Sequence, residues 1–237
     1  MATLLSAIET QARRHLIETT ASFWSSAELI DIANQGIKDL WRDIVDLKQE
    51  HFLTVDTTNV TMAANTATLT GVPTDVHKVY LIEPVDTSSG ATNEGLIFVP
   101  RDYNHPIVQA ARSSDAVESD HNHIYYSVTG AGAPTGTAST VIYVAPQITS
   151  AATLRFVYVP VLAAVAAGGN NPIPGEADNA LIAWVVAYAR AKEREDRSPD
   201  PNWLMVYKTE KDHLMQSLGL RQLQEPSYVD ALFEVYW

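Results

Sequence analysis

The chain contains no cysteine, which excludes disulfide bonds and thiolate metal sites and gives no indication of a redox compartment. It is also poor in basic residues, with 16 Lys and Arg against 28 Asp and Glu and a formal net charge of -12. Tight, sequence-independent binding of nucleic acid needs clustered Lys and Arg to neutralise phosphates. The sequence has no such cluster, so we do not expect DNA or RNA as a tightly held ligand, although DNA could pass an acidic surface without binding to it.

Long apolar segments are missing as well. The longest apolar run, residues 180–189, is about half of the roughly 20 residues that a membrane-spanning helix needs. It is therefore interpreted as a buried core helix. The N-terminus lacks a basic region followed by an apolar core, so we expect neither a secretory signal nor a membrane partner.

Motifs that carry chemistry are scarce. No Gly-x-Ser-x-Gly or comparable nucleophile motif occurs. The glycine-rich residues 130–136 precede an expected strand, whereas a phosphate-binding loop needs a following helix N-terminus. We interpret one cluster of potential metal ligands as a solvated acidic loop, with a metal-dependent enzyme as the weaker alternative: Asp115, Glu118, Asp120, His121 and His123. We expect no catalytic residue, no cofactor and no metal.

What the sequence does contain is a change of hydrophobic period along its length. Apolar residues recur at helical spacing in residues 3–47 and 176–218, whereas residues 52–160 consist of short β-prone runs separated by turn residues. Helices from opposite ends of a chain need each other to bury their apolar faces. The predicted fold is therefore α+β. Residues 1–50 and 172–219 form a helical bundle body, residues 51–162 form an inserted antiparallel β domain (a sandwich or a barrel), and residues 220–237 form an aromatic tail.

Capping signals predict the helix boundaries. Ser25 followed by Glu28 predicts a capping box at the start of the second helix. Asp200 before Pro201 predicts the start of the last helix, and Gly219 its left-handed end. The helix that opens near residue 175 is apolar most of the way round, which predicts a central position in the bundle. The expected structural anchors are Trp24, Trp41, Trp184 and Trp203.

The aromatic tail and a mixed-charge run at residues 192–200 are the candidate interaction sites. Chain termini are mostly polar, whereas this tail carries side chains whose burial is worth ~1.5–3 kcal/mol each. We expect it to dock on a neighbouring subunit or partner, with folding back on its own core as the alternative. Alternating charges can set the register between identical neighbours, although the run could also be a solvated helix end. The candidate interface residues are Tyr228, Leu232, Phe233, Val235, Tyr236, Trp237, Arg194 and Arg197.

Two helical segments have a recognisable sequence. Residues 24–36 read WSSAELIDIANQG, and residues 173–181 read IPGEADNAL, followed by YARAKE at 188–193. The first segment resembles the opening of the second helix in phage head-to-tail adaptor proteins of the short-tailed-phage type, and the second is similar to the segment that restarts the helical body of those proteins. The β insertion fits the family in character, whereas the long aromatic tail departs from its pattern.

The resemblance implies a non-enzymatic virion protein, made in the host cytoplasm, that joins the portal protein to a tail or nozzle protein. Family members form a ring, typically of twelve copies, and such a ring would let DNA pass during genome ejection without specific binding. The rival interpretation, from a different class, is a β-rich tail or fibre module that recognises a surface glycan. Its aromatic platforms would be Tyr125, Tyr126 and Tyr143.

Overall fold

The computed structural model describes residues 3–18, 23–85, 96–113, 123–130, 140–148, 151–194 and 198–220. The chain divides into two compact units, one of residues 1–51 with 164–237 and the other of residues 52–163. The described segments contain five α-helices and two sheets, which confirms the predicted α+β class. None of the helices in these segments has both the length and the apolar character required to cross a bilayer.

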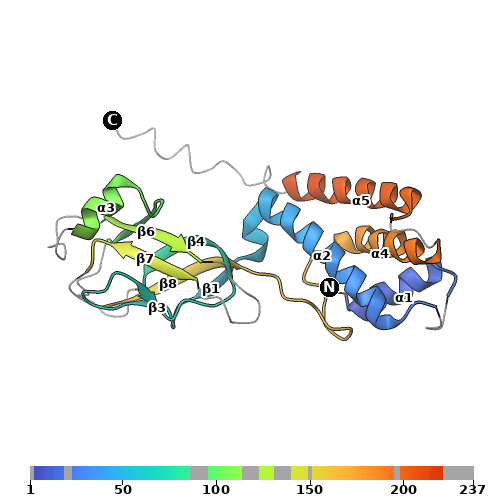
Figure 1. Cartoon of the computed structure of the whole chain (residues 1–237), viewed down its shortest axis with the longest axis horizontal. Helices are drawn as coiled ribbons and strands as arrows, with labels where there is room; N and C mark the ends of the chain where they lie inside the picture. The colour runs from blue at the N-terminus through green and yellow to red at the C-terminus, as the bar shows by residue number, and fades with distance from the viewer. Residues whose placement is uncertain are drawn as a thin grey trace, which may run out of the picture. The chain divides into compact units, whose positions relative to one another are not determined.

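The helical unit has one helix, α4, at its centre. It consists of α1 (Leu5–His15), α2 (Ser26–Lys48), α4 (Asp178–Glu193) and α5 (Pro201–Leu220), together with the short 3-10 helices η1 (Gln49–Phe52), which runs to its border, and η2 (Gly175–Ala177). Helix α4 packs against α1, α2 and α5 (Figure 1). Most of its residues are buried, on every side of the helix, as its all-round apolar surface leads one to expect.

Local capping fixes where the main helices begin. The Ser25 hydroxyl accepts from the Glu28 N–H at 3.2 Å, and the Ser25 N–H donates to Glu28 Oε2 at 2.9 Å, so the predicted capping box is present. The Asp200 carboxylate accepts from the first N–H groups of α5, that of Asn202 at 2.9 Å among them. The prediction for Gly219 is wrong, because this glycine keeps a helical backbone and α5 continues through it to Leu220.

Residues 164–174 return the chain to the helical unit and bind to its first two helices. The Asn34 side chain on α2 clamps the backbone of Val165, since its Nδ2 donates to the Val165 carbonyl at 3.0 Å and its Oδ1 accepts from the Val165 N–H at 2.8 Å. At the start of α1, the Leu5 N–H donates to the Gly169 carbonyl at 3.0 Å. These bonds join residues that are more than 130 positions apart in the sequence.

The larger sheet of the β unit is built around its last strand. It contains β1 (Thr54–Asp56), β2 (Thr61–Met62), β3 (Leu69–Thr70), β4 (Val76–Pro84) and β8 (Ala152–Pro160). Strand β8 pairs antiparallel with β1, β2 and β4, and β3 pairs with β2. A strand that returns after nearly a hundred residues therefore organises this sheet.

The smaller sheet contains β5 (Ile97–Pro100), β6 (His123–Thr129) and β7 (Val141–Ala145), with β6 in the middle. Strands β6 and β7 are antiparallel, but β5 and β6 are parallel, with Ile97 opposite His123. The expectation of a wholly antiparallel domain is therefore wrong. Parallel neighbours need a crossover of a dozen or more residues, and the connection that includes α3 (Pro106–Ser113) supplies it.

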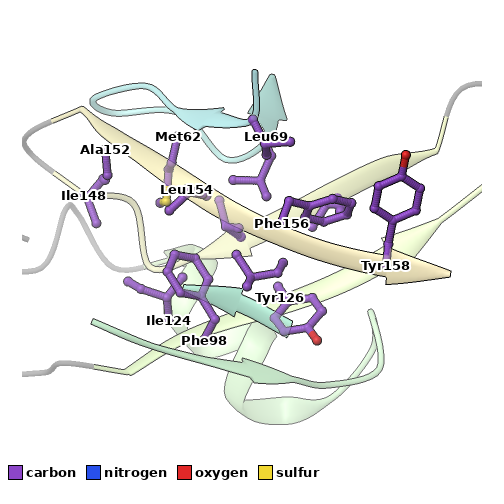
Figure 2. Packing of buried hydrophobic residues seen from close by; sticks show 14 of the residues in the cluster. Met62, Leu69, Phe98, Ile124, Tyr126, Ile148, Ala152, Leu154, Phe156 and Tyr158 are labelled. Atoms are coloured by element: carbon purple, nitrogen blue, oxygen red, sulfur yellow. The ribbon is translucent and has the colours of Figure 1, made fainter. Parts of the chain in front are cut away.

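The two sheets share one hydrophobic core. Met62, Leu154 and Phe156 from the larger sheet lie in the same cluster as Phe98 and Ile124 from the smaller sheet (Figure 2). Neither sheet closes into a barrel over the described strands. Of the two predicted forms, the barrel is therefore wrong, and the β unit consists of two small sheets that face a common interior.

Candidate functional site

Tryptophan side chains anchor the helices of the helical unit. Trp24, in the turn before α2, is 5% exposed, and its Nε1 donates to the Ala189 carbonyl of α4 at 2.9 Å. Trp203 at the start of α5 packs on His15 at the end of α1, with 5.0 Å between ring centroids. Both residues join segments from opposite ends of the sequence.

The contact between α2 and α4 is close at one point. Trp184 Nε1 donates to the Ile32 carbonyl at 3.1 Å. The indole packs against the tilted ring of Tyr188 and edge-on against Tyr207, with ring centroids 4.4 and 4.9 Å away. A Cβ atom at Gly36 would lie 2.7 Å from Trp184 Cδ1 and 2.9 Å from Leu181 Cδ1. A larger residue here would force one of these side chains to move, so glycine allows the two helices to approach this closely.

A polar cluster joins α2 to α5. Lys211 Nζ lies 2.8 Å from Asp39 Oδ2, which also accepts a hydrogen bond from the Tyr207 hydroxyl, and the same Nζ pairs with Asp43. Burial alone would raise the pKa of Asp39, but the hydrogen bonds from Lys211 and Tyr207 outweigh it and lower that pKa. The pKa of Tyr207 is raised, mainly because the hydroxyl is buried and secondly because it donates a hydrogen bond to the Asp39 carboxylate. The cluster therefore holds an ionised carboxylate between two helices and has a structural role.

The mixed-charge run at the end of α4 is partly paired within the chain. Lys192 Nζ lies 2.8 Å from Glu28 Oε1. The hydrogen bond from Lys192 to Glu28 is the main reason that the pKa of Glu28 is lowered to about 2, and the hydrogen bonds from Ser25 lower it further. Arg194 is exposed, and its Nη2 lies 3.7 Å from Asp200 Oδ2. These pairs stabilise the end of α4, while Arg194 remains accessible from outside.

The other predicted interface residues cannot be placed. Arg197 and the tail residues lie outside the described residues: Tyr228, Leu232, Phe233, Val235, Tyr236 and Trp237. The assignment of these side chains to an interface therefore remains a prediction.

Large apolar side chains are exposed on the helical unit, and one of them has an unusual backbone. Met205 on α5 is 69% exposed and Phe23 is 50% exposed. Ile17 is 90% exposed and has a φ of 59°. Ile17 lies just after the last turn of α1, where the Glu18 N–H donates to the Arg13 carbonyl at 3.0 Å. This hydrogen bond closes the helix end, and the left-handed position that Ile17 occupies in such an end is normally taken by glycine. A β-branched residue in this conformation is strained.

The β unit contains a pocket of about 490 Å³ at the carboxyl end of β5. Ligands of open sheets with parallel strands commonly bind outside these strand ends. Ser127 on β6 is 3% exposed, and its Oγ has no hydrogen-bond partner among the described residues. A lone serine in a strand gives no sequence signal, so this site was not predicted. The volume of about 490 Å³ is lined by Pro100, Arg101, Asp102, Tyr103, His105, Tyr126, Ser127 and Val128.

The tyrosines of the glycan-binding interpretation do not form one platform. Tyr126 is 5% exposed and belongs to the hydrophobic core that the two sheets share (Figure 2). Its neighbour Tyr125 points to the opposite face, because successive strand residues alternate. Tyr143 packs edge-on against Tyr103 with 5.1 Å between ring centroids.

Only one member of the proposed metal cluster, His123, is described. Asp115, Glu118, Asp120 and His121 lie outside the described residues. Within the part of the chain that the structure describes, no three His, Asp or Glu side chains come together in a way that could hold a metal ion.

Comparison with known proteins gives one family. The model of a family described as SU10 adaptor protein matches residues 2–228, which include the whole β unit and nearly all of the helical unit. No curated protein matches the sequence.

Proposed function

Since the chain belongs to the SU10 adaptor protein family, we propose that it joins a phage head to its tail as a ring. The family match also confirms the resemblance to phage head-to-tail adaptors. The ring would contain about twelve copies, as the family resemblance implies. It would lie between the portal protein and a tail or nozzle protein. The family is structural rather than enzymatic, so the proposed role is assembly and mechanical connection.

The family match over residues 2–228 is the observation that carries this proposal. Three large apolar side chains of the helical unit are available for contacts with a neighbouring copy. Ile17 is 90% exposed, Met205 69% and Phe23 50%. Contacts between neighbouring copies would cover them in a ring.

The proposed contacts between copies also use the predicted interface residues. Arg194 lies 3.7 Å from Asp200 through one nitrogen, and a guanidinium has five N–H donors, so it can also bind an acidic group on a neighbour. Arg197 would act in the same way. The aromatic tail, with Tyr228, Phe233 and Trp237, would supply the apolar part of the interface.

Charge supports passage of DNA without binding. The net charge is -12, and the sequence has no cluster of Lys and Arg of the kind that neutralises phosphates. Acidic groups that line a channel would repel the DNA backbone and reduce adhesion during ejection.

The test is imaging of the purified chain by negative-stain electron microscopy, with and without its cognate portal protein. We expect rings on the portal, and deletion of residues 221–237 should weaken assembly while circular dichroism and the melting temperature stay unchanged. Arg194→Glu should also weaken assembly. Its matched control is Arg155→Glu, since Arg155 is likewise exposed and paired, with Glu83 at 2.7 Å. A chain that stays monomeric on its portal would refute the proposal.

A further inference from the structure

The outward faces of α1 and α5 have the properties of the two halves of a contact between copies. We propose that the outward face of α5 in one copy packs on the outward face of α1 in the next copy, with Met205 against Ile17. This inference rests on the proposed ring and names the two surfaces that meet in it.

The two faces point away from each other within one copy. Helix α4 lies between α1 and α5 and packs against both (Figure 1). At one end of the unit, His15 of α1 packs on Trp203 of α5, with 5.0 Å between ring centroids. Met205 follows Trp203 by two residues, about 200° further round the helix, so it points away from α1. Two different faces of one unit can join head to tail, which is the kind of contact that closes a ring of identical copies.

The outward face of α5 is a stripe of exposed residues at helical spacing. Its apolar member, Met205, is 69% exposed. Further along, the stripe carries an acid, Asp212, which forms no ion pair with another described residue. The stripe consists of Met205, Thr209, Asp212 and Gln216.

The outward face of α1 is complementary in charge. It carries the exposed Arg14, which likewise forms no ion pair with another described residue. The acid of this helix, Glu9, is paired with the buried Arg13 at 2.9 Å and does not cancel the charge of Arg14. A basic face repels a second basic face and attracts an acidic one. The charges therefore favour α1 against the α5 of another copy over α1 against α1.

Ile17 is the observation that indicates a covered surface. Single exposed apolar residues are common, but Ile17 is 90% exposed and also has a φ of 59°, so it strains the backbone and gains little burial in its own chain. The Arg13 side chain supports this turn, since it pairs with Glu18 at 3.4 Å and donates to the Trp24 carbonyl at 3.0 Å. Strained residues that the surrounding structure holds in place cluster at functional sites. Burial against Met205 of a neighbour would offset the strain.

The first test uses the full chain with Met205 replaced by p-benzoylphenylalanine, a photo-crosslinker. Copies labelled with ¹⁵N are mixed with unlabelled copies, assembled on the portal, irradiated and analysed by mass spectrometry. We expect crosslinks from position 205 to residues 10–17 in pairs of one labelled and one unlabelled chain. Crosslinks to other regions, or only within single chains, would overturn the inference.

A substitution at Ile17 separates the contact from folding. Ile17→Asn relieves the backbone, so this variant should be at least as stable as the parent in urea. It should nevertheless raise the chain concentration needed for half-maximal ring formation about tenfold, because burial of the isoleucine side chain is lost. The matched control is Ile107→Asn, at an exposed isoleucine of the β unit, which should leave that concentration unchanged. Equal ring formation by the Ile17→Asn variant and the parent would overturn the inference.

Reversal of the two charges tests which faces meet. Arg14→Asp or Asp212→Arg alone places like charges across the contact and should raise the half-maximal concentration about two- to fivefold, the value of an exposed ion pair. A mixture of the two single variants leaves mismatched contacts, whereas the double variant restores opposite charges and should assemble like the parent. A double variant no better than the single ones would overturn the inference.

The same samples separate this inference from the proposed function. If rings form on the portal but position 205 crosslinks elsewhere, the assignment of the two faces is wrong and the adaptor role stands. If the parent chain forms no assembly by electron microscopy, both are refuted.

Discussion

Replacement of Gly36 by alanine tests how closely α2 and α4 approach. The added methyl group would lie 2.7 Å from Trp184 Cδ1 and 2.9 Å from both Trp184 Cγ and Leu181 Cδ1. Carbon atoms in contact prefer about 3.5–4.0 Å, so one of the side chains must move. Trp184 is held by its hydrogen bond to Ile32 and by the rings of Tyr188 and Tyr207, which makes this movement costly.

Two opposing effects set the magnitude. Alanine is favoured over glycine inside a helix by about 0.5–1 kcal/mol. Overpacking of a well-packed interior costs about 1–3 kcal/mol. We therefore expect Gly36→Ala to lower the free energy of unfolding by about 1 kcal/mol, despite the better helix propensity.

Urea unfolding followed by tryptophan fluorescence measures this change. The matched control is Gly219→Ala, because Gly219 is also helical but a Cβ there meets no atom of the described residues within 4 Å. This variant should be as stable as the parent or more stable. Combining Gly36→Ala with Trp184→Ala should cost less than the sum of the two changes, since the clash disappears. A stabilised Gly36→Ala variant, or strict additivity, would refute the reasoning.

Three further changes probe other contacts. Ile17→Asn should raise the free energy of unfolding by about 1 kcal/mol in urea, because asparagine tolerates the positive φ of 59° at this exposed site; a less stable variant would contradict this. The pKa of Glu28 is lowered from 4.5 to about 2, so its capping contribution is complete above pH 4.5 and is lost as the pH falls toward 2. Lys192→Met should move that pKa back toward 4.5 in an NMR titration, and an unchanged value would rule out the pairing. Asn34→Ala removes two hydrogen bonds to Val165 and should destabilise the protein by about 2 kcal/mol in the same urea assay, whereas unaltered stability would mean that the return segment is held elsewhere.

Much of the helical unit could be predicted because its signals are local. The capping box needs only Ser25 and Glu28, three positions apart, and both form the expected bonds. The N-cap at Asp200 is equally local. The end of α5 was missed because a glycine near a helix end can be its last helical residue or the residue after it, and the local sequence does not separate these cases.

The pairing of strands is not a local property. Strand β5 has the same β-prone pattern whether its neighbour runs parallel or antiparallel, so the parallel pair with β6 could not be deduced from its sequence. The pocket depends on that pair, since its lining comes from β6 and from the end of β5 with the loop that follows, and the Arg101 N–H of this loop donates to the Tyr126 carbonyl. The left-handed backbone of Ile17 was also unpredictable, because isoleucine is among the residues least suited to it.

The position of the β unit between α2 and α4 has a consequence for synthesis on the ribosome. The first two helices emerge early, but the partner they need, α4, follows only after the whole β unit has been translated. At ~5–20 residues per second, residues 52–163 take roughly 6–20 s to appear. During that interval the apolar faces of α1 and α2 lack the helix that covers them in the folded protein.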